Sequence, residues 1–146
     1  MKVILGADHA GLELKAHLVA HLTSLGHEVT DLHDEALEVD YPDMAAALCS
    51  RITDGSHPLG ILVCGTGVGI SIAANKIPGI RAACISDVYS ARMCRSHNDA
   101  NVLCLGGRTL GPEKAYELAE LFLSEPFAGD RHARRVEKIA KLENRG

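Results

Sequence analysis

The sequence predicts an α/β domain with a five-stranded parallel sheet and helices on both faces of that sheet. Short apolar runs alternate along the chain with longer segments that carry apolar residues at helical spacing. Runs such as ILVC at 61–64 lack polar–apolar alternation, which is typical of strands buried on both faces. The length of 146 residues suits one hydrophobic core, and we therefore expect a single domain over 1–146.

The first half of the chain contains three predicted strands and two predicted helices. The strands are KVILG at 2–6, HEVTDL at 27–32 and GILVC at 60–64, of which the first and third are apolar runs. A helix is predicted over 12–25, because apolar residues recur there at helical spacing: Leu12, Ala16, Val19, Leu22 and Leu25. Gly26 follows as a common helix stop. A second helix is predicted over 43–53, after the turn-like pair Tyr41-Pro42.

The second half begins with a glycine-rich loop that leads into a helix. The predicted elements, in chain order, are a helix to about residue 76, a strand at 81–86, a helix at 87–96, a strand at 102–105, and helices at 112–124 and about 130–143. Pro78-Gly79 interrupts the chain after the first of these helices. Pro112 suits the first turn of a helix, and Asp130 is a candidate N-cap for the last one.

Composition narrows the function classes. Apolar residues make up 47% and charged residues 23% of the chain, as in ordinary globular proteins. The formal net charge of −4 disfavours nucleic-acid binding, which depends on a surplus of Lys and Arg. No apolar run approaches the roughly 20 residues that cross a bilayer, and the start MKVILGADHA lacks the form of a signal peptide, so we expect no membrane association. Five isolated cysteines without CxxC spacing favour reduced thiols and a cytoplasmic location.

The candidate site lies in the loops that follow the strands. In parallel α/β sheets, ligands bind outside the carboxyl ends of the strands. The loop after the first strand carries Asp8 and His9, and the loop after the third strand is CGTGVG, which starts at Cys64. We therefore expect these two loops to form part of one site.

The glycine loop is compatible with more than one chemistry. The dinucleotide fingerprint G-x-G-x-x-G does not match, because the third glycine comes one residue early, at Gly69. Asp87 could still serve as the acid that binds the ribose. A P-loop fails because no Lys-Ser or Lys-Thr pair stands at the required spacing. A cysteine phosphatase would need Cys-x5-Arg, and the sixth residue after Cys64 is Ile70.

A third chemistry also fits. Successive amides of Gly65–Gly69 at a helix N-terminus can stabilise negative charge. If Cys64 removes a proton next to a carbonyl, these amides would stabilise the enediolate oxygen that forms. The alternative is that Cys64 is a small core residue, like the other four cysteines. Glu13, His17 and His21 share helical spacing, but a solvent-facing polar stripe explains them better than a metal site, so we assign no metal.

Five motifs resemble the ribose/galactose isomerase family, which includes type B ribose-5-phosphate isomerases, allose-6-phosphate isomerases and galactose-6-phosphate isomerase subunits. The motifs are GADHAGLELK, DYPDMA, CGTGVGISIAANKIPGIRA, SHNDANVLCLGGR and, more weakly, DRHARRVEKI. The resemblance spans nearly the whole chain. It implies a three-layer α/β/α Rossmann-like domain with a five-stranded parallel sheet, and a homodimer or dimer of dimers that needs no cofactor. It also implies isomerisation of ribose 5-phosphate and ribulose 5-phosphate through a cis-enediolate, a step of the non-oxidative pentose phosphate pathway.

The resemblance also assigns roles to residues of this chain. Cys64 is implied to be the base that moves the proton between C1 and C2, and His97 to open the sugar ring with help from Asp8. Ile70 stands where other branches of the family have a glutamate base, so this chain follows the cysteine branch. The remaining implied roles are an anion hole at Gly65, Thr66, Gly67, Val68 and Gly69, a sugar contact at Asn98, and phosphate contacts at His9, Arg108, Arg131 and Arg135.

The predicted topology places His97 away from Cys64 of its own chain. The helix at 87–96 starts at the carboxyl edge of the sheet and must end at the opposite edge before the fifth strand begins. We therefore expect active sites shared between subunits of a dimer. Arg131 and Arg135 lie one turn apart and can face one anion, so the last helix is expected to contribute to the dimer and to the phosphate site.

The sequence leaves the substrate partly open. LHDEALEV, which starts at Leu32, replaces a glycine-containing turn of the family, so the preferred carbon-chain length is in doubt. The enzyme alternatives are an allose-6-phosphate isomerase, a galactose-6-phosphate isomerase, or one subunit of the latter. Because this chain retains both Cys64 and His97, it is not expected to be a subunit that depends on a different partner chain. From a different class, the chain could be a nucleotide-binding regulatory module that uses the glycine loop and Asp87.

Overall fold

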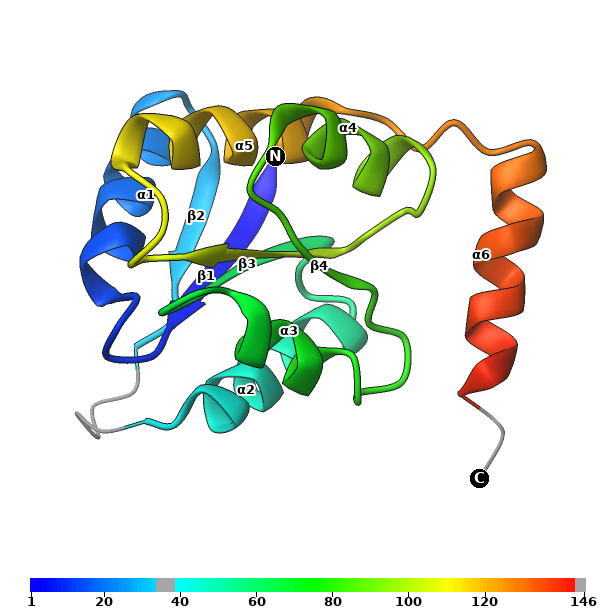
Figure 1. The fold of residues 1–146 in the computed structure, drawn as a ribbon, viewed down its shortest axis with the longest axis horizontal. Helices are drawn as coiled ribbons and strands as arrows, with labels where there is room; N and C mark the ends of the chain where they lie inside the picture. The colour runs from blue at the N-terminus through cyan, green and yellow to red at the C-terminus, as the bar shows by residue number, and fades with distance from the viewer. Residues whose placement is uncertain (34–38, 144–146) are drawn as a thin grey trace.

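Five parallel strands form one sheet in the order β2-β1-β3-β5-β4, with helices on both faces, in the computed structural model of the protein (Figure 1). The structure describes residues 1–33 and 39–143. The strands are β1 (Lys2–Ala7), β2 (Glu28–Asp31), β3 (Leu59–Cys64), β4 (Ala82–Cys84) and β5 (Val102–Gly106). The predicted fold class and all five predicted strands are confirmed.

Six helices complete the described chain. They are α1 (Leu12–Ser24), α2 (Tyr41–Thr53), α3 (Val68–Ala74), α4 (Val88–Ser96), α5 (Pro112–Ser124) and α6 (Arg131–Leu142). Helices α1, α4 and α5 cover one face of the sheet, and α2 and α3 cover the other (Figure 1). Within the described ranges, no helix has the length and apolar character that a membrane crossing requires.

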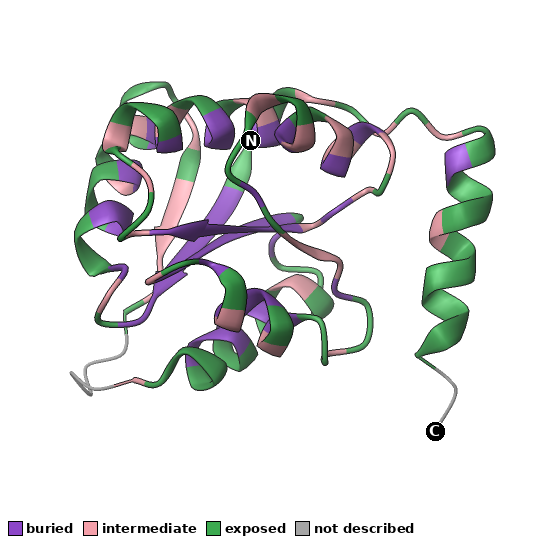
Figure 2. Ribbon diagram, in the orientation of Figure 1, coloured by how far each residue is buried: buried purple, intermediate pink, exposed green. Residues whose placement is uncertain are grey.

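The core has two layers, one on each face of the sheet. Every residue of β3 is buried, so this central strand contributes side chains to both layers (Figure 2). Polar–apolar alternation is absent from this strand because neither of its faces meets water. The larger layer is mostly aliphatic, and its largest fully buried side chain is Phe122 of α5. The low aromatic content of the sequence is therefore matched by a core of Leu, Ile, Val and Ala.

Two local predictions about helices were wrong. Tyr41-Pro42 is not a turn but the first turn of α2, where proline is tolerated because the first N–H groups of a helix need no intrahelical acceptor. In α1 the buried stripe is Leu14, Leu18 and Leu22, whereas Leu12 is 46% exposed. The buried stripe also includes Lys15, whose Nζ lies 2.7 Å from Asp31 Oδ1, so a charged residue obscured the periodicity.

Helix α6 projects away from the layered body and is largely exposed (Figures 1 and 2). Asp130 occupies the N-cap position as predicted, but its side chain makes no capping hydrogen bond and its φ is 49°. The helix touches the body at both ends: His132 stacks on His97, and Glu143 Oε1 accepts a hydrogen bond from Gly79 N–H at 2.8 Å. Between these contacts lies a groove of about 760 Å³, lined on the α6 side by Ile139 and Leu142.

Gly11 allows the loop after β1 to lie directly on β3. A Cβ at this position would lie 2.4 Å from the Val63 carbonyl oxygen and 2.6 Å from its carbon. The φ of −103° is open to any residue, so only the backbone contact requires glycine.

We expect Gly11→Ala to lower the free energy of unfolding by about 2–3 kcal/mol, because backbone atoms must move apart. Gly111→Ala is the matched control, since a Cβ there would meet only Glu113 Oε2 at 4.0 Å. This control should lose less than about 1 kcal/mol, the usual effect of alanine at a helix N-cap. Urea unfolding of the two variants measures the difference, and equal losses would contradict the close contact.

Candidate active site

The carboxyl ends of β1, β3 and β5 meet at one edge of the sheet, where they position the candidate site. Ala7 pairs with Val63, and Cys64 pairs with Gly106, so Asp8, Cys64 and Gly107 reach this edge side by side. Two backbone hydrogen bonds join the loops after β3 and β5: Gly107 N–H donates to Cys64 O at 2.7 Å, and Arg108 N–H donates to Gly65 O at 2.9 Å. The predicted meeting of the loops after β1 and β3 is also observed, since Asp8 N–H donates to Val63 O at 3.2 Å.

Cys64 is the last residue of β3 and lies under the glycine loop. Its side chain is only 4% exposed, and Gly67 N–H donates a hydrogen bond to its Sγ at 3.2 Å. Gly67 has a φ of +83°, a left-handed conformation that suits glycine and that turns its amide toward the sulfur. The sulfur thus has a backbone donor next to it in a site largely closed to water.

The other four cysteines are held as thiols. Burial raises the pKa of Cys49 to about 12 and that of Cys94 to about 11, and it raises the pKa of Cys104 well above its usual range. Cys84 was predicted to be a core residue, but it is exposed, and its Sγ lies 3.7 Å from Thr66 O. Partial burial and then the nearby Cys64 sulfur raise the pKa of Cys84.

The glycine loop already uses two of its predicted amide donors. Gly67 N–H is bonded to Cys64, and Val68 N–H donates to Thr66 Oγ1 at 3.2 Å. Within the described residues, the amides of Gly65, Thr66 and Gly69 have no protein acceptor. They lie at the N-terminal end of α3, where a ligand oxygen would find donors.

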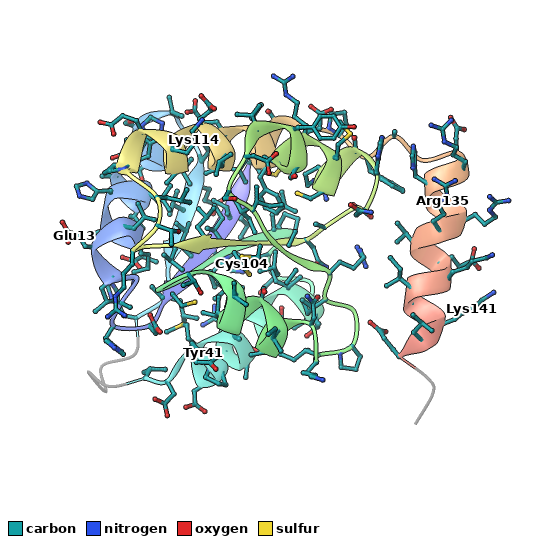
Figure 3. The ribbon with its side chains drawn as sticks, in the orientation of Figure 1. Glu13, Tyr41, Cys104, Lys114, Arg135 and Lys141 are labelled. Atoms are coloured by element: carbon teal, nitrogen blue, oxygen red, sulfur yellow. The ribbon has the colours of Figure 1, made fainter. Side chains whose placement is uncertain are left out.

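Tyr41, part of the turn-like pair in the sequence, lies against the same loop. A Cβ on Gly69 would lie 2.9 Å from Cε1 and Cζ of the Tyr41 ring, so only glycine admits this contact. Tyr41 is the first residue of α2 and remains 41% exposed (Figure 3). Helix α2 packs under the glycine loop, so a residue at its N-terminus could have been expected to contact that loop. The assignment of Tyr41 to a turn prevented this prediction.

His9 and Arg108 share a pocket next to the glycine loop. The pocket has a volume of about 400 Å³ and is lined also by Glu13 and His17 of α1. Arg108 lies against Gly65, where a Cβ would be 3.6 Å from its Cδ and Nη1. Asp8 is buried, and its Oδ1 accepts hydrogen bonds from the amides of Ala10 at 3.0 Å and Gly11 at 3.2 Å. One oxygen of Asp8 therefore shapes the loop that carries His9.

The remaining predicted site residues lie elsewhere: His97, Asn98, Arg131 and Arg135. His97 follows α4 at the amino edge of the sheet, whereas Cys64 pairs with the last residue of β5 at the carboxyl edge. The five residues of β5 make this separation at least about 13 Å, from a rise of roughly 3.3 Å per residue. Arg131 and Arg135 are exposed on α6, which projects away from the layered body (Figures 1 and 3). One chain therefore holds the candidate site residues in two separate groups, or half-sites, one around Cys64 and one around His97.

His97 has a neighbour that the sequence analysis did not single out. The His132 ring stacks on the His97 ring, with centroids 4.0 Å apart and an interplanar angle of 11°. Burial, followed by the charges of His97, Arg131 and Arg135, lowers the pKa of His132. A neutral His132 can therefore remain stacked on His97 when the pH falls slightly below neutral.

Neither the metal nor the nucleotide alternative gains support from the geometry. His21 stacks on Tyr116 and lies 3.2 Å from Glu120, so it belongs to the packing of α1 on α5. Across the described ranges, no cluster of three His, Cys, Asp or Glu side chains is arranged to hold a metal ion. Asp87 accepts a hydrogen bond from Ser90 N–H at 2.8 Å, which caps α4 and lowers the pKa of the carboxyl. The carboxylate proposed for a ribose is thus already engaged.

Comparison with known proteins gives consistent matches over the whole chain. The Ribose/Galactose Isomerase family matches residues 3–139. Ribose-5-phosphate isomerase B of Escherichia coli is 46% identical over 145 residues, covering 99% of this chain and 97% of that protein. The D-erythrulose-4-phosphate isomerase of Pectobacterium atrosepticum is 44% identical, covering 99% and 96%. The structure of Mycoplasma genitalium ribose-5-phosphate isomerase B with bound ribulose-5-phosphate superposes with a TM-score of 0.92 at 37% identity, covering 99% and 97%.

Proposed function

Because the chain belongs to the ribose/galactose isomerase family, we propose that it interconverts ribose 5-phosphate and ribulose 5-phosphate through a cis-enediolate. The observation that carries this proposal is the position of Cys64, buried at the carboxyl edge of the sheet under a loop of backbone donors. A proton acceptor beside a ready set of amides is what abstraction of a proton next to a carbonyl requires.

In the proposed reaction Cys64 acts as a thiolate base. It takes the proton from C2 of the open aldose and returns it to C1, with the reverse order for the ketose. The negative charge moves to the substrate oxygen, and the unpaired amides of Gly65, Thr66 and Gly69 stabilise it there. The hydroxyl proton on the C2 oxygen moves to the C1 oxygen as the carbonyl shifts from C1 to C2, so the step is balanced with no cofactor.

The phosphate and the ring-opening groups come from both half-sites. His9 and Arg108 are proposed to bind the phosphate from the Cys64 side, and Arg131 and Arg135 from the other side. Cationic side chains at the N-terminus of α6 oppose its dipole unless an anion joins them. His97 is proposed to open the furanose ring, with Asp8 assisting and Asn98 contacting the sugar oxygens.

A homodimer, or a dimer of dimers, brings the half-sites together. His97 and Cys64 of one chain lie at opposite edges of the sheet, out of reach of a single sugar. The α6 groove of about 760 Å³ and the apolar side chains beside it, including Ile139 at 45% exposure and Leu142 at 56%, are a surface that a second copy would cover. A cytoplasmic location completes the proposal, because a thiol base needs reducing surroundings.

The test of this function is a comparison of initial rates on ribose 5-phosphate, allose 6-phosphate, galactose 6-phosphate and erythrulose 4-phosphate. We expect kcat/KM for ribose 5-phosphate to exceed the others by about tenfold or more, since one sugar carbon alters the span between base and phosphate. Thermal shift supplies the second arm: sugar phosphates should stabilise the protein and nucleotides should not. A higher kcat/KM for a six-carbon or four-carbon sugar phosphate would show that ribose 5-phosphate is not the preferred substrate. Stabilisation by nucleotides alone would favour the nucleotide-binding regulatory module over an isomerase.

A further inference from the structure

The turn after α4 carries His97 and Asn98 and ends in a strained residue, Asp99. Four successive amides fold back onto the end of α4: those of His97 and Asn98 donate to Met93 O at 2.9 and 3.3 Å, and those of Asp99 and Ala100 donate to Arg95 O and Cys94 O at 3.2 and 2.8 Å. Asp99 then adopts a φ of 48°, a left-handed conformation that glycine or asparagine would enter more easily. The turn thus has one backbone shape, although its last residue does not favour that shape by itself.

Two arginines from different elements hold Asp99. Arg95 of α4 places Nη1 2.9 Å from Asp99 Oδ1 and also donates to Ala100 O at 2.7 Å. Arg81, which precedes β4, places Nη2 3.4 Å from Asp99 Oδ2, and its Nε donates to Asp99 O at 2.8 Å. The carboxylate and the carbonyl of one residue are therefore both bound to arginine side chains.

This arrangement is more than a surface ion pair. The Arg95 side chain is 14% exposed, against 33% for Asp99 and 26% for Arg81, and its guanidinium lies 5.9 Å from the centre of the Phe122 ring, so the cluster is partly shielded from solvent. A glycine at 99 would supply the backbone conformation but neither carboxylate contact. The side chain of Asp99 therefore adds two contacts to arginine side chains that the backbone conformation of the turn does not require.

The opposite side of the turn is fixed as well. His132 stacks on His97 at 4.0 Å, and Ala128 N–H donates to Ser96 O at 2.9 Å. His97 is thus held between the first turn of α6 and the turn that Asp99 closes. A movement of Asp99 would shift the backbone two residues before it, and the His97 ring with it.

We propose that Asp99, held by Arg81 and Arg95, is a positioning residue that fixes the His97 turn for opening of the furanose ring. The inference rests on the proposed function of His97. In ring opening, the hydroxyl on C1 loses its proton to the base, C1 becomes a carbonyl, the bond from C1 to the ring oxygen breaks, and the ring oxygen accepts a proton. The acceptor must lie within hydrogen-bond reach of that hydroxyl, so a displacement of about 1 Å can lower the rate up to a hundredfold.

Ribulose 5-phosphate separates ring opening from proton transfer. Its C5 oxygen carries the phosphate, so the ketose cannot close a furanose ring. Loss of its C1 proton to deuterium oxide needs Cys64 but not ring opening. A defect in positioning His97 should therefore lower turnover of ribose 5-phosphate and spare this exchange.

The test is Asp99→Asn, which keeps the size of the side chain and suits a positive φ. We expect kcat for ribose 5-phosphate to fall about tenfold or more, with exchange at C1 of ribulose 5-phosphate within about twofold of the wild-type rate. Arg81→Gln should give the same split, and it keeps the inference testable if Asp99→Asn unfolds. The matched control is Glu117→Gln, which removes a carboxylate paired with Lys114 on exposed α5 and should change neither rate.

His97→Ala distinguishes the possible failures. If His97→Ala shows the split and Asp99→Asn does not, or if Asp99→Asn and Arg81→Gln lower both rates equally, the positioning role is wrong and the proposed function stands. If His97→Ala itself lowers both rates equally, the ring-opening role of His97 is wrong, and the role of Asp99 falls with it.

Discussion

Replacement of Cys64 by serine is expected to lower kcat by about a hundredfold to ten-thousandfold, the range that loss of a general base produces. A serine hydroxyl gives up its proton far less readily than a thiol, so little conjugate base is present at neutral pH. The fold should persist, because serine is slightly smaller and its Oγ can accept the Gly67 N–H that now lies 3.2 Å from Sγ. KM should change little, since the loss falls on the transition state.

Steady-state kinetics with ribose 5-phosphate measures this loss, and Cys84→Ser is the matched control. Cys84 is a thiol at the same edge of the sheet, exposed and next to Thr66. Its replacement should leave kcat within about threefold of the wild type, as surface substitutions usually do. A normal rate for Cys64→Ser, or a larger loss for Cys84→Ser, would show that the base has been assigned to the wrong sulfur.

Mixing two inactive homodimers, Cys64→Ala and His97→Ala, is expected to restore about a quarter of the wild-type activity after subunit exchange. Random exchange makes half of the dimers mixed, and in a mixed dimer one of the two shared sites contains both Cys64 and His97. The prediction follows from the topology, because Cys64 ends β3 at one edge of the sheet and His97 follows α4 at the other.

Initial rates at equal total protein, before and after exchange, measure the recovery. Exchange itself is checked by mass spectrometry of the intact dimers, with one variant labelled with heavy nitrogen. If mixed dimers form and activity stays at the level of the separate variants, each site is complete within one chain. The half-site arrangement would then be wrong.

Much of the fold could be predicted because it depends on local patterns. Unbroken apolar runs marked the central strands β3 and β5, and the glycines after Cys64 marked the turn into α3. The buried face of α1 was predicted wrongly because Lys15 lies on it, where its ion pair with Asp31 makes burial tolerable. That pair joins residues that are distant in the sequence, and periodicity contains no information about it.

The candidate site, like the fold, could be predicted from the sequence only in part. The loop of Cys64 could be located from the rule that parallel strands end at one edge, and the register of β3 with β5 agrees with it. The support of the His97 turn could not be located, because Arg81 and Asp99 are 18 residues apart in the sequence and nothing in their motifs indicates that the two side chains meet. Contacts of this kind require the folded chain.

Incubation of ribulose 5-phosphate with the protein in deuterium oxide tests the central claim most directly, namely that a thiolate moves a proton between adjacent sugar carbons. Proton NMR should show ribose 5-phosphate appearing with deuterium at C2, and Cys64→Ser should slow the appearance of both the aldose and the label by about a hundredfold or more. Formation of no aldose, or of aldose whose C2 hydrogen never exchanges and whose rate is unaffected by Cys64→Ser, would contradict the account.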